Sequence, residues 1–360
     1  MPIQPNILER FAFFTLNAAP TPMLDLAGAL GYQALSTAVR LHLFETLQER
    51  PLTIPELAQN LNCQERGLNH LLKALDGLGY VTAKNGRYHN TTMTEKWFTD
   101  GTMLDLNSAI TCWDAFLHDL WPHAPEVIQS GKRPYNFYDY TASQPGLSHA
   151  HQQMMSGNAN LNAPEIVKRV KLPAGPTRLL DVGGGHGAYA IHFCQANPNL
   201  QATILDSEIA LETARQHVTA NDLTKRIHLQ PADIWQVEWG TDFDLVLLFN
   251  FIHHYDLETN VKLLQKAHAA LKPGGQLAIF DQLESKQFGS AINGLLRLIS
   301  LMYYLFADGR IFSREEVQQM LDKARFSNMQ FFTTPMWAGQ SLVTAVKQSS
   351  IQSEASNGKQ

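Results

Sequence analysis

The alternation of short aliphatic segments with amphipathic segments after Pro173 constrains the fold more than any other feature of the sequence. Helical periodicity follows several of the aliphatic segments, for example over 257–271. Parallel strands need crossover connections, and these are usually helices. This half of the chain is therefore predicted to be an α/β domain with a doubly wound sheet. Its strands are predicted in the segments RLLDVG, ATILD, RIHLQPAD, FDLVLLFNFI and QLAIFDQ.

The first half of the chain is predicted to be mostly helical. Leucines at helical spacing occur between Glu56 and Val81, and a hairpin with its turn at Asn85 and Gly86 follows. Helix, turn, helix and hairpin in this order form a winged-helix-like pattern.

The charge of the chain argues against a nucleic-acid or anionic-membrane partner. The 360 residues carry 28 basic and 33 acidic side chains, which gives a formal net charge of -5. Within the winged-helix-like segment, acidic residues balance the basic residues Arg66 and Lys73. The helix in the position of a DNA-recognition helix is therefore not basic, which argues against DNA binding. We expect this segment to dimerise the protein, and a transcription regulator is the alternative from another class.

A glycine-rich loop follows the first predicted strand, at the place where open α/β sheets bind their ligands. The run DVGGGHGAYA contains the pattern D-x-G-x-G-x-G, formed by Asp181, Gly183, Gly185 and Gly187. The dinucleotide pattern G-x-G-x-x-G/A also matches, with Ala188 in its last position. An aspartate before the glycines would repel a pyrophosphate, whereas it suits a ligand with an ammonium group and a sulfonium centre.

Two more aspartates follow the next two predicted strands. Asp206 is placed to accept hydrogen bonds from both hydroxyls of a ribose. Asp233 is placed to accept one from an adenine amino group, with Ile234 and Trp235 on the two sides of the ring. Together with Asp181, these carboxylates favour S-adenosylmethionine over a nicotinamide cofactor.

These motifs, together with NFIHHYDLE and LKPGG, resemble the class I S-adenosylmethionine-dependent O-methyltransferases, of the type that includes plant caffeate and acetylserotonin O-methyltransferases. The resemblance extends from about Leu30 to Ala345, because the winged-helix-like segment matches the dimerisation domain of that family. It implies a Rossmann-like methyltransferase domain, the cofactor S-adenosyl-L-methionine and a small-molecule acceptor. By the resemblance, the loop around Gly183 holds the methionyl part of the cofactor. Phe249 stands where plant members have a cofactor-contacting lysine.

Two histidines, His253 and His254, follow the fourth predicted strand and are candidates for removing a proton from the acceptor. An imidazole with a pKa near 6.5 accepts a proton near neutral pH. The resemblance selects His253 as the general base, and Asp281, at the end of the next strand, as the carboxylate that orients it. A second base-supporting glutamate of plant members falls on Ile311. This departure leaves open a C- or N-methyltransferase in which the histidine only positions the acceptor.

The resemblance also indicates the residues that contact the acceptor. The segment QMMSGN matches a helix that lines the substrate pocket in the family, and methionine gives an adaptable wall against a planar ring. The histidine pair His149 and His151 lacks a third ligand at useful spacing, so no metal is expected. The predicted substrate-binding residues are Met155, Asn158, Asn250, Met302 and Phe306.

We therefore expect an O-methyltransferase that acts on a hydroxyl of a small aromatic or polyketide-like metabolite. Its expected domains are a helical dimerisation and substrate-capping domain over 1–165, a methyltransferase domain over 166–347 and a disordered tail over 348–360. Only 17% of the residues are charged, which fits burial of surface between two copies of the chain. No stretch is apolar enough to span a membrane, and the three cysteines lack disulfide spacing. A cytoplasmic homodimer is expected.

Overall fold

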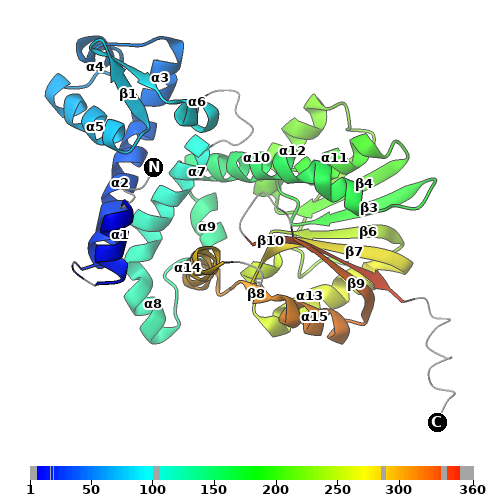
Figure 1. Cartoon of the computed structure of the whole chain (residues 1–360). Helices are drawn as coiled ribbons and strands as arrows, with labels where there is room; N and C mark the ends of the chain where they lie inside the picture. The colour runs from blue at the N-terminus through cyan, green and yellow to red at the C-terminus, as the bar shows by residue number, and fades with distance from the viewer. Residues whose placement is uncertain are drawn as a thin grey trace. The chain divides into compact units, whose positions relative to one another are not determined.

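The computed structural model describes residues 6–16, 18, 20–99, 106–284, 289–333 and 339–348. The chain divides into two compact units, residues 1–115 and 116–360 (Figure 1). The domain boundary expected near residue 165 lies inside a long helix of the second unit, and the expected tail falls almost wholly outside the described residues. Among the described residues, every helix is too short or too polar to cross a lipid bilayer.

In the described part of the first unit, the regular elements are helices and one hairpin. Buried Phe44, Leu57 and Leu72 belong to its hydrophobic core. The predicted hairpin is confirmed, and its turn residues Asn85 and Gly86 have the positive φ angles, 51° and 73°, that a two-residue hairpin turn requires. The elements are α1 (Ile7–Phe14), α2 (Pro22–Arg40), α3 (Leu43–Glu49), α4 (Ile54–Asn60), α5 (Glu65–Gly77), β1 (Val81–Lys84), β2 (Arg87–Asn90), α6 (Thr92–Phe98) and α7 (Leu106–Ala115).

The second unit contains an eight-stranded sheet. The strand order is β5-β4-β3-β6-β7-β10-β9, and β8 pairs with β7. β3 to β7 are parallel, as predicted, whereas β10 is antiparallel to both β7 and β9, so the sheet is mixed. The strands are β3 (Thr177–Val182), β4 (Leu200–Asp206), β5 (Ile227–Pro231), β6 (Phe243–Phe249), β7 (Leu271–Glu284), β8 (Phe312–Ser313), β9 (Phe326–Thr333) and β10 (Gln340–Lys347).

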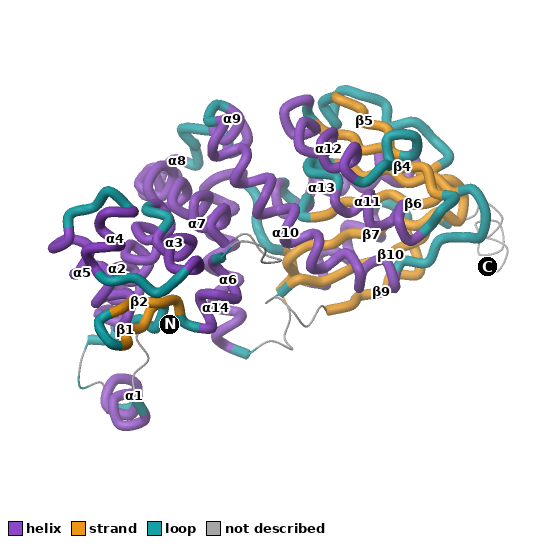
Figure 2. Tube along the Cα trace, turned by 90° about the horizontal axis from the view of Figure 1, so that it is seen from above, coloured by secondary structure: helices purple, strands orange, loops and turns teal. Residues whose placement is uncertain are grey.

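Helices cover both faces of this sheet. α10, α11 and α12 lie on one face, and α13 and α15 lie on the other (Figures 1 and 2). The helical elements are η1 (Phe116–Leu120), η2 (Trp121–His123), α8 (Ala124–Ser130), α9 (Phe137–Ala142), α10 (Pro145–Arg169), α11 (Ala188–Ala196), α12 (Glu208–Ala220), η3 (Ile252–His254), α13 (Leu257–Ala270), α14 (Ser290–Ala307) and α15 (Arg314–Lys323).

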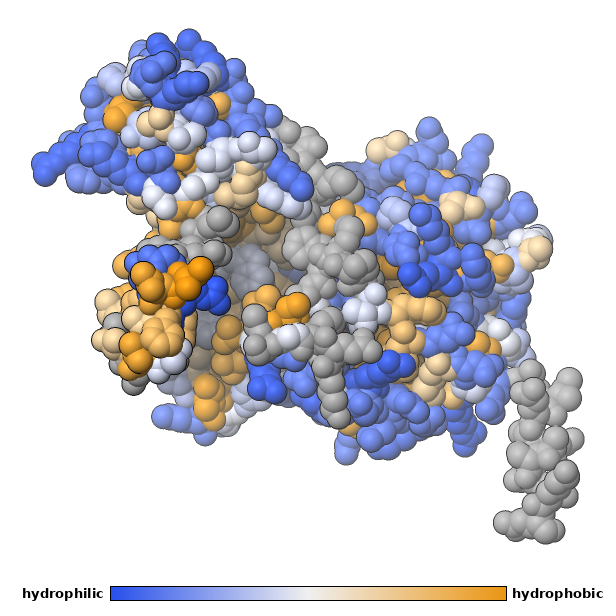
Figure 3. All heavy atoms as spheres, viewed as in Figure 1, coloured by the Kyte–Doolittle hydropathy of each residue, from blue (hydrophilic) through white to orange (hydrophobic). Residues whose placement is uncertain are grey.

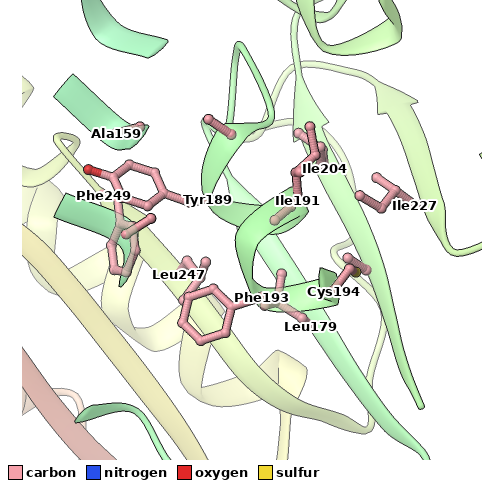
Figure 4. Close-up of a cluster of buried hydrophobic side chains, with 14 of the residues drawn as sticks. Ala159, Leu179, Tyr189, Ile191, Phe193, Cys194, Ile204, Ile227, Leu247 and Phe249 are labelled. Atoms are coloured by element: carbon pink, nitrogen blue, oxygen red, sulfur yellow. The ribbon is translucent and has the colours of Figure 1, made fainter. Parts of the chain in front are cut away.

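The core of the second unit explains the continuous aliphatic run of β6. Every residue of β6 is buried, because the strand lies in the middle of the sheet with helices on both sides. On the face of α10 and α11, Leu247 of β6 packs near Phe193 and Leu179 (Figure 4). This packing holds the carboxyl ends of β3, β4, β6 and β7 side by side, and most of the predicted site residues follow these ends.

Candidate active site

The glycine loop continues β3 and leads into α11. Gly183, Gly185 and Gly187 have φ angles of 70°, 39° and 74°, a left-handed backbone that glycine adopts without strain. At Gly183 a Cβ atom would also collide with the ring of Phe251, which follows β6. The path of the loop therefore requires these glycines, and the close approach of Phe251 requires Gly183 in particular.

Asp206, the last residue of β4, holds the loop in place. Its Oδ2 atom accepts a hydrogen bond from the backbone N–H of Gly185 at 2.9 Å, and its Oδ1 atom accepts one from Ser207 at 2.7 Å. Burial raises the pKa of Asp206, and these backbone hydrogen bonds oppose the rise. Gln152 of α10 approaches the same loop, since a Cβ at Gly185 would lie 3.2 Å from its Oε1 atom.

Asp181 supplies a buried carboxylate with unused hydrogen-bonding capacity. The residue is only 1% exposed, and its Oδ2 atom has no hydrogen-bond partner among the described residues. Burial raises the pKa of Asp181 to about 7, and the charge of Asp206 contributes to the rise. A buried acceptor without a donor is costly. An ammonium group bound at the loop would supply that donor, so the residues present fit the amino-acid end of S-adenosylmethionine.

Asp233 lies beside a pair of aromatic residues, Trp235 after β5 and Tyr255 after β6. Its Oδ1 atom accepts the backbone N–H of Trp235 at 2.8 Å. The Trp235 ring meets the Tyr255 ring edge-on at 5.3 Å, and the indole N–H donates to the Tyr255 hydroxyl at 3.4 Å. Burial raises the pKa of Tyr255, and the charges of Asp233 and Asp206 raise it further. Tyr255, which the sequence analysis did not single out, therefore lies against Trp235 and within electrostatic range of Asp233 and Asp206.

His253 and Asp281 form the predicted pair. Nδ1 of His253 lies 2.7 Å from Oδ1 of Asp281, and the two side chains are 7% and 1% exposed. The other carboxylate oxygen, Oδ2, accepts the backbone N–H groups of Phe251 and Ile252, both at 3.1 Å. The pairing follows from the sheet, because β6 and β7 are adjacent and parallel and η3 turns back directly after β6.

Two further imidazoles lie close enough to His253 to be affected by its charge. The His254 ring lies 4.0 Å from the His253 ring, and its pKa is well below the usual value because of burial first, and then the charges of His253 and His151. Burial and the charge of His253 lower the pKa of His151, on α10, to about 4. Both rings are therefore neutral at pH 7. Among the described residues, no group of three potential ligands could hold a metal ion.

The residues predicted to bind the methyl acceptor lie on α10 and α14 and at the end of β6. Phe306 stacks on Phe116 at 5.0 Å, Phe116 contacts Phe137 at 5.1 Å, and Phe137 meets the His151 ring at 5.4 Å. This series of aromatic contacts connects α14 to His151. Met302 is buried on the same helix as Phe306.

The remaining predicted residues have varied environments. Met155 and Asn158 are partly buried on α10, and Oδ1 of Asn158 accepts a hydrogen bond from Asn162 at 2.9 Å. Asn250 has a φ of 49°, which turns the chain at the end of β6. Ile234 is buried in the core on the α13 face. Phe249 is also buried, and its ring lies 4.6 Å from Tyr189 (Figure 4).

Known proteins resemble both units of the chain. Residues 125–327 match the O-methyltransferase domain, and residues 25–100 match the O-methyltransferase dimerisation domain. The L-tyrosine C(3)-methyltransferase of Streptomyces lavendulae is 27% identical over 91% of this chain and 94% of its own. The 3-hydroxy-5-methyl-1-naphthoate 3-O-methyltransferase of Streptomyces sahachiroi is 27% identical over 79% of this chain and 83% of its own.

The fold is also that of a solved methyltransferase. Human N-acetylserotonin methyltransferase, whose structure contains S-adenosylmethionine, has a TM-score of 0.81 at 21% identity, over 96% of this chain and 100% of that one. The O-methyltransferase domain match covers more than half of the chain. This chain therefore belongs to the O-methyltransferase family and is an S-adenosylmethionine-dependent methyltransferase with a dimerisation domain.

Proposed function

We propose that this enzyme methylates a hydroxyl oxygen of a small aromatic or polyketide-like metabolite, with His253 as the general base. The 2.7 Å contact between Nδ1 of His253 and Oδ1 of Asp281 carries the proposal. Because the carboxylate accepts the proton of Nδ1, Nε2 is the nitrogen that takes the proton of the acceptor. When bound, S-adenosylmethionine supplies a methyl group on a positively charged sulfur.

The acceptor hydroxyl loses its proton to Nε2 of His253 while its oxygen forms the bond to the methyl carbon. S-adenosylmethionine, held by the glycine loop, Asp206 and Asp233, would supply the methyl group and would leave as the neutral thioether. Asp281 stabilises the imidazolium that forms, since the two side chains are buried together. The neutral rings of His254 and His151 add no positive charge that would oppose protonation of His253.

The predicted cofactor residues keep their proposed roles. We assign the amino-acid end of the cofactor to Asp181 and the loop of Gly183, Gly185 and Gly187, and the unsatisfied oxygen of Asp181 supports this assignment. Asp206 would bind the ribose. The adenine would lie beside Asp233 and Ile234. The proposed role of Phe249 is to pack under the cofactor. The acceptor would contact the residues Met155, Asn158, Asn250, Met302 and Phe306.

A second candidate is methylation of a ring carbon. It is favoured by the similarity to the tyrosine C(3)-methyltransferase, whereas similarity to the naphthoate O-methyltransferase favours oxygen. In the second candidate, His253 positions the acceptor hydroxyl and the methyl group goes to carbon.

One experiment tests the base and separates the two candidates. The purified enzyme is incubated with methyl-¹³C S-adenosylmethionine and a cell extract, and the labelled product is identified by NMR and mass spectrometry. An oxygen-bound methyl carbon resonates far downfield of a ring-bound one. We expect an O-methyl product that is lost with His253→Gln and retained with His254→Gln. The reverse order of the two variants would overturn the choice of His253.

The enzyme is also proposed to be a cytoplasmic homodimer. Apolar atoms gather on the surface over α1 and α2 (Figure 3), where Phe14, Leu26 and Leu30 are 61%, 50% and 63% exposed. The dimerisation domain match includes the last two of these residues. A second copy of the chain would remove this apolar surface from water. The three free cysteines support a reducing compartment.

A further inference from the structure

We propose that Tyr303 is a positioning residue that holds the imidazole plane of His253 during methyl transfer. The inference rests on the proposed role of His253 as the base. The two rings lie face to face, with centroids 4.0 Å apart and planes inclined by only 11°. A stack this close to parallel resists rotation of the imidazole about its Cβ–Cγ bond, because any turn would drive the ring edge into the phenol.

Tyr303 belongs to a network of contacts that includes both His253 and Asp281. The Tyr303 hydroxyl donates to Oε1 of Gln282 at 2.8 Å. Gln282 follows Asp281 directly, and its backbone N–H donates to Oδ1 of Asp281 at 2.8 Å. That same oxygen bonds to Nδ1 of His253 at 2.7 Å. One edge of the imidazole is thus held by Asp281 and one face by Tyr303, and both holding groups are tied to the end of β7.

The end of α14 is anchored against the backbone that carries the base. Gly309 lies so close to the carbonyl of His253 that a Cβ atom would collide with it. Arg133 donates to the Tyr304 carbonyl and to Oδ1 of Asp308, both at 2.7 Å. Tyr303 therefore projects from a helix end whose position relative to His253 is set by backbone packing as well as by its own ring.

The stack also suits the charge that the reaction creates. When Nε2 takes the acceptor proton, the imidazolium faces the electron-rich side of the phenol ring, an attractive arrangement. Removing the ring should therefore reduce the rate of the chemical step and leave cofactor binding unchanged. A merely structural role would instead lower stability and affect both.

The test compares Tyr303→Leu with Tyr303→Phe and with the control Leu298→Ala. Leu298 lies on the same helix, α14, and is 60% exposed. We expect Tyr303→Leu to lower kcat about ten- to a hundred-fold through misplacement of the base, with an unchanged KM for S-adenosylmethionine. Tyr303→Phe keeps the stacked ring and should keep most of kcat. Leu298→Ala should retain the wild-type kcat.

An NMR measurement reports the stack without relying on activity. In protein with ¹³C-labelled histidine, the Hε1 resonance of His253 is identified by its absence in His253→Gln. The ring current of Tyr303 shifts this resonance upfield, so it should move downfield in Tyr303→Leu and stay in Tyr303→Phe. An unmoved resonance and wild-type kcat in Tyr303→Leu, with an inactive His253→Gln, would overturn the role of Tyr303 alone. Full activity of His253→Gln would instead overturn the proposed base, and the role of Tyr303 with it.

Discussion

Asp281 binds both the ring of His253 and the backbone that leads to it. Its Oδ1 atom contacts Nδ1 of His253 at 2.7 Å, while its Oδ2 atom accepts the N–H groups of Phe251 and Ile252 at 3.1 Å. The carboxylate therefore determines the tautomer of the imidazole and the turn that places it. Removing its charge has two separate consequences.

Asp281→Asn should lower kcat on the order of 10²- to 10⁴-fold, because the amide no longer stabilises the imidazolium and can favour the wrong tautomer. It should also lower the free energy of unfolding by about 1–3 kcal/mol, because a buried set of hydrogen bonds loses an acceptor. Steady-state kinetics and urea unfolding measure the two effects. Asp322→Asn, at an exposed position of α15, is the control and should change neither. A kcat within a few-fold of wild type would contradict the role of Asp281.

The parallel part of the fold could be predicted because its signals are local. β6 is an unbroken aliphatic run, and each of the five predicted strands appears in the structure. β9 and β10 were not predicted. In β9 only Phe326 is buried and the other residues are partly buried or exposed, which is a weaker signal. β10 is mostly buried, but its antiparallel direction depends on its pairing with β7 and β9.

The candidate site divides in the same way. The resemblance predicts the pairing of His253 with Asp281, and the structure explains it by the adjacency of β6 and β7. The contacts of Tyr303 and His151 depend on how α14 and α10 pack on the unit, and helical periodicity does not specify which residue meets the base. The stacking of Tyr303 on the base is a contact that the sequence does not indicate.

Asp206→Asn should weaken the binding of S-adenosylhomocysteine about ten- to a hundred-fold, measured by titration calorimetry. The variant loses a carboxylate oxygen that accepts the N–H of Gly185 at 2.9 Å, so both the ribose contact and the loop are affected. Glu212→Gln, on the exposed side of α12, should bind with wild-type affinity. Unchanged affinity of Asp206→Asn would exclude its role in cofactor binding.

Leu30→Glu should convert the proposed dimer into a monomer, because it places a charge in apolar surface that a second copy would cover. Leu30 is 63% exposed in the single chain, so the variant should not disturb the fold of the monomer. Sedimentation velocity over a range of concentrations measures the change. Gln59→Glu, an exposed position of α4, introduces the same side chain and should remain dimeric. A dimeric Leu30→Glu would place the interface elsewhere.

Asp181 should make the cofactor-free enzyme less stable as the pH rises from about 4 to about 7. Burial raises the pKa of Asp181 from 3.8 to about 7 in the folded chain. Within this window the native state holds a proton that the unfolded state has released, so the contribution of Asp181 to the free energy of unfolding falls with rising pH and is constant above it. Asp181→Asn should remove a dependence on the order of a few kcal/mol. Urea unfolding of the wild type and of Asp181→Asn at pH 4.5 and 7.5 tests this prediction. It would be contradicted if the free energies of unfolding of the two proteins differed by the same amount at both pH values.

Cofactor binding should release the proton that Asp181 holds in the free enzyme. At pH 6 the carboxyl group of Asp181 is largely protonated, because its pKa in the free enzyme is about 7. An ammonium group next to its unsatisfied Oδ2 atom favours the ionised form, so binding of S-adenosylhomocysteine should release about one proton. Titration calorimetry at pH 6 in buffers with different ionisation enthalpies counts the released protons. The release should vanish at pH 8.5, where Asp181 is already ionised, and in Asp181→Asn at pH 6. Equal heats in all buffers for the wild type would show that the ammonium group binds away from Asp181.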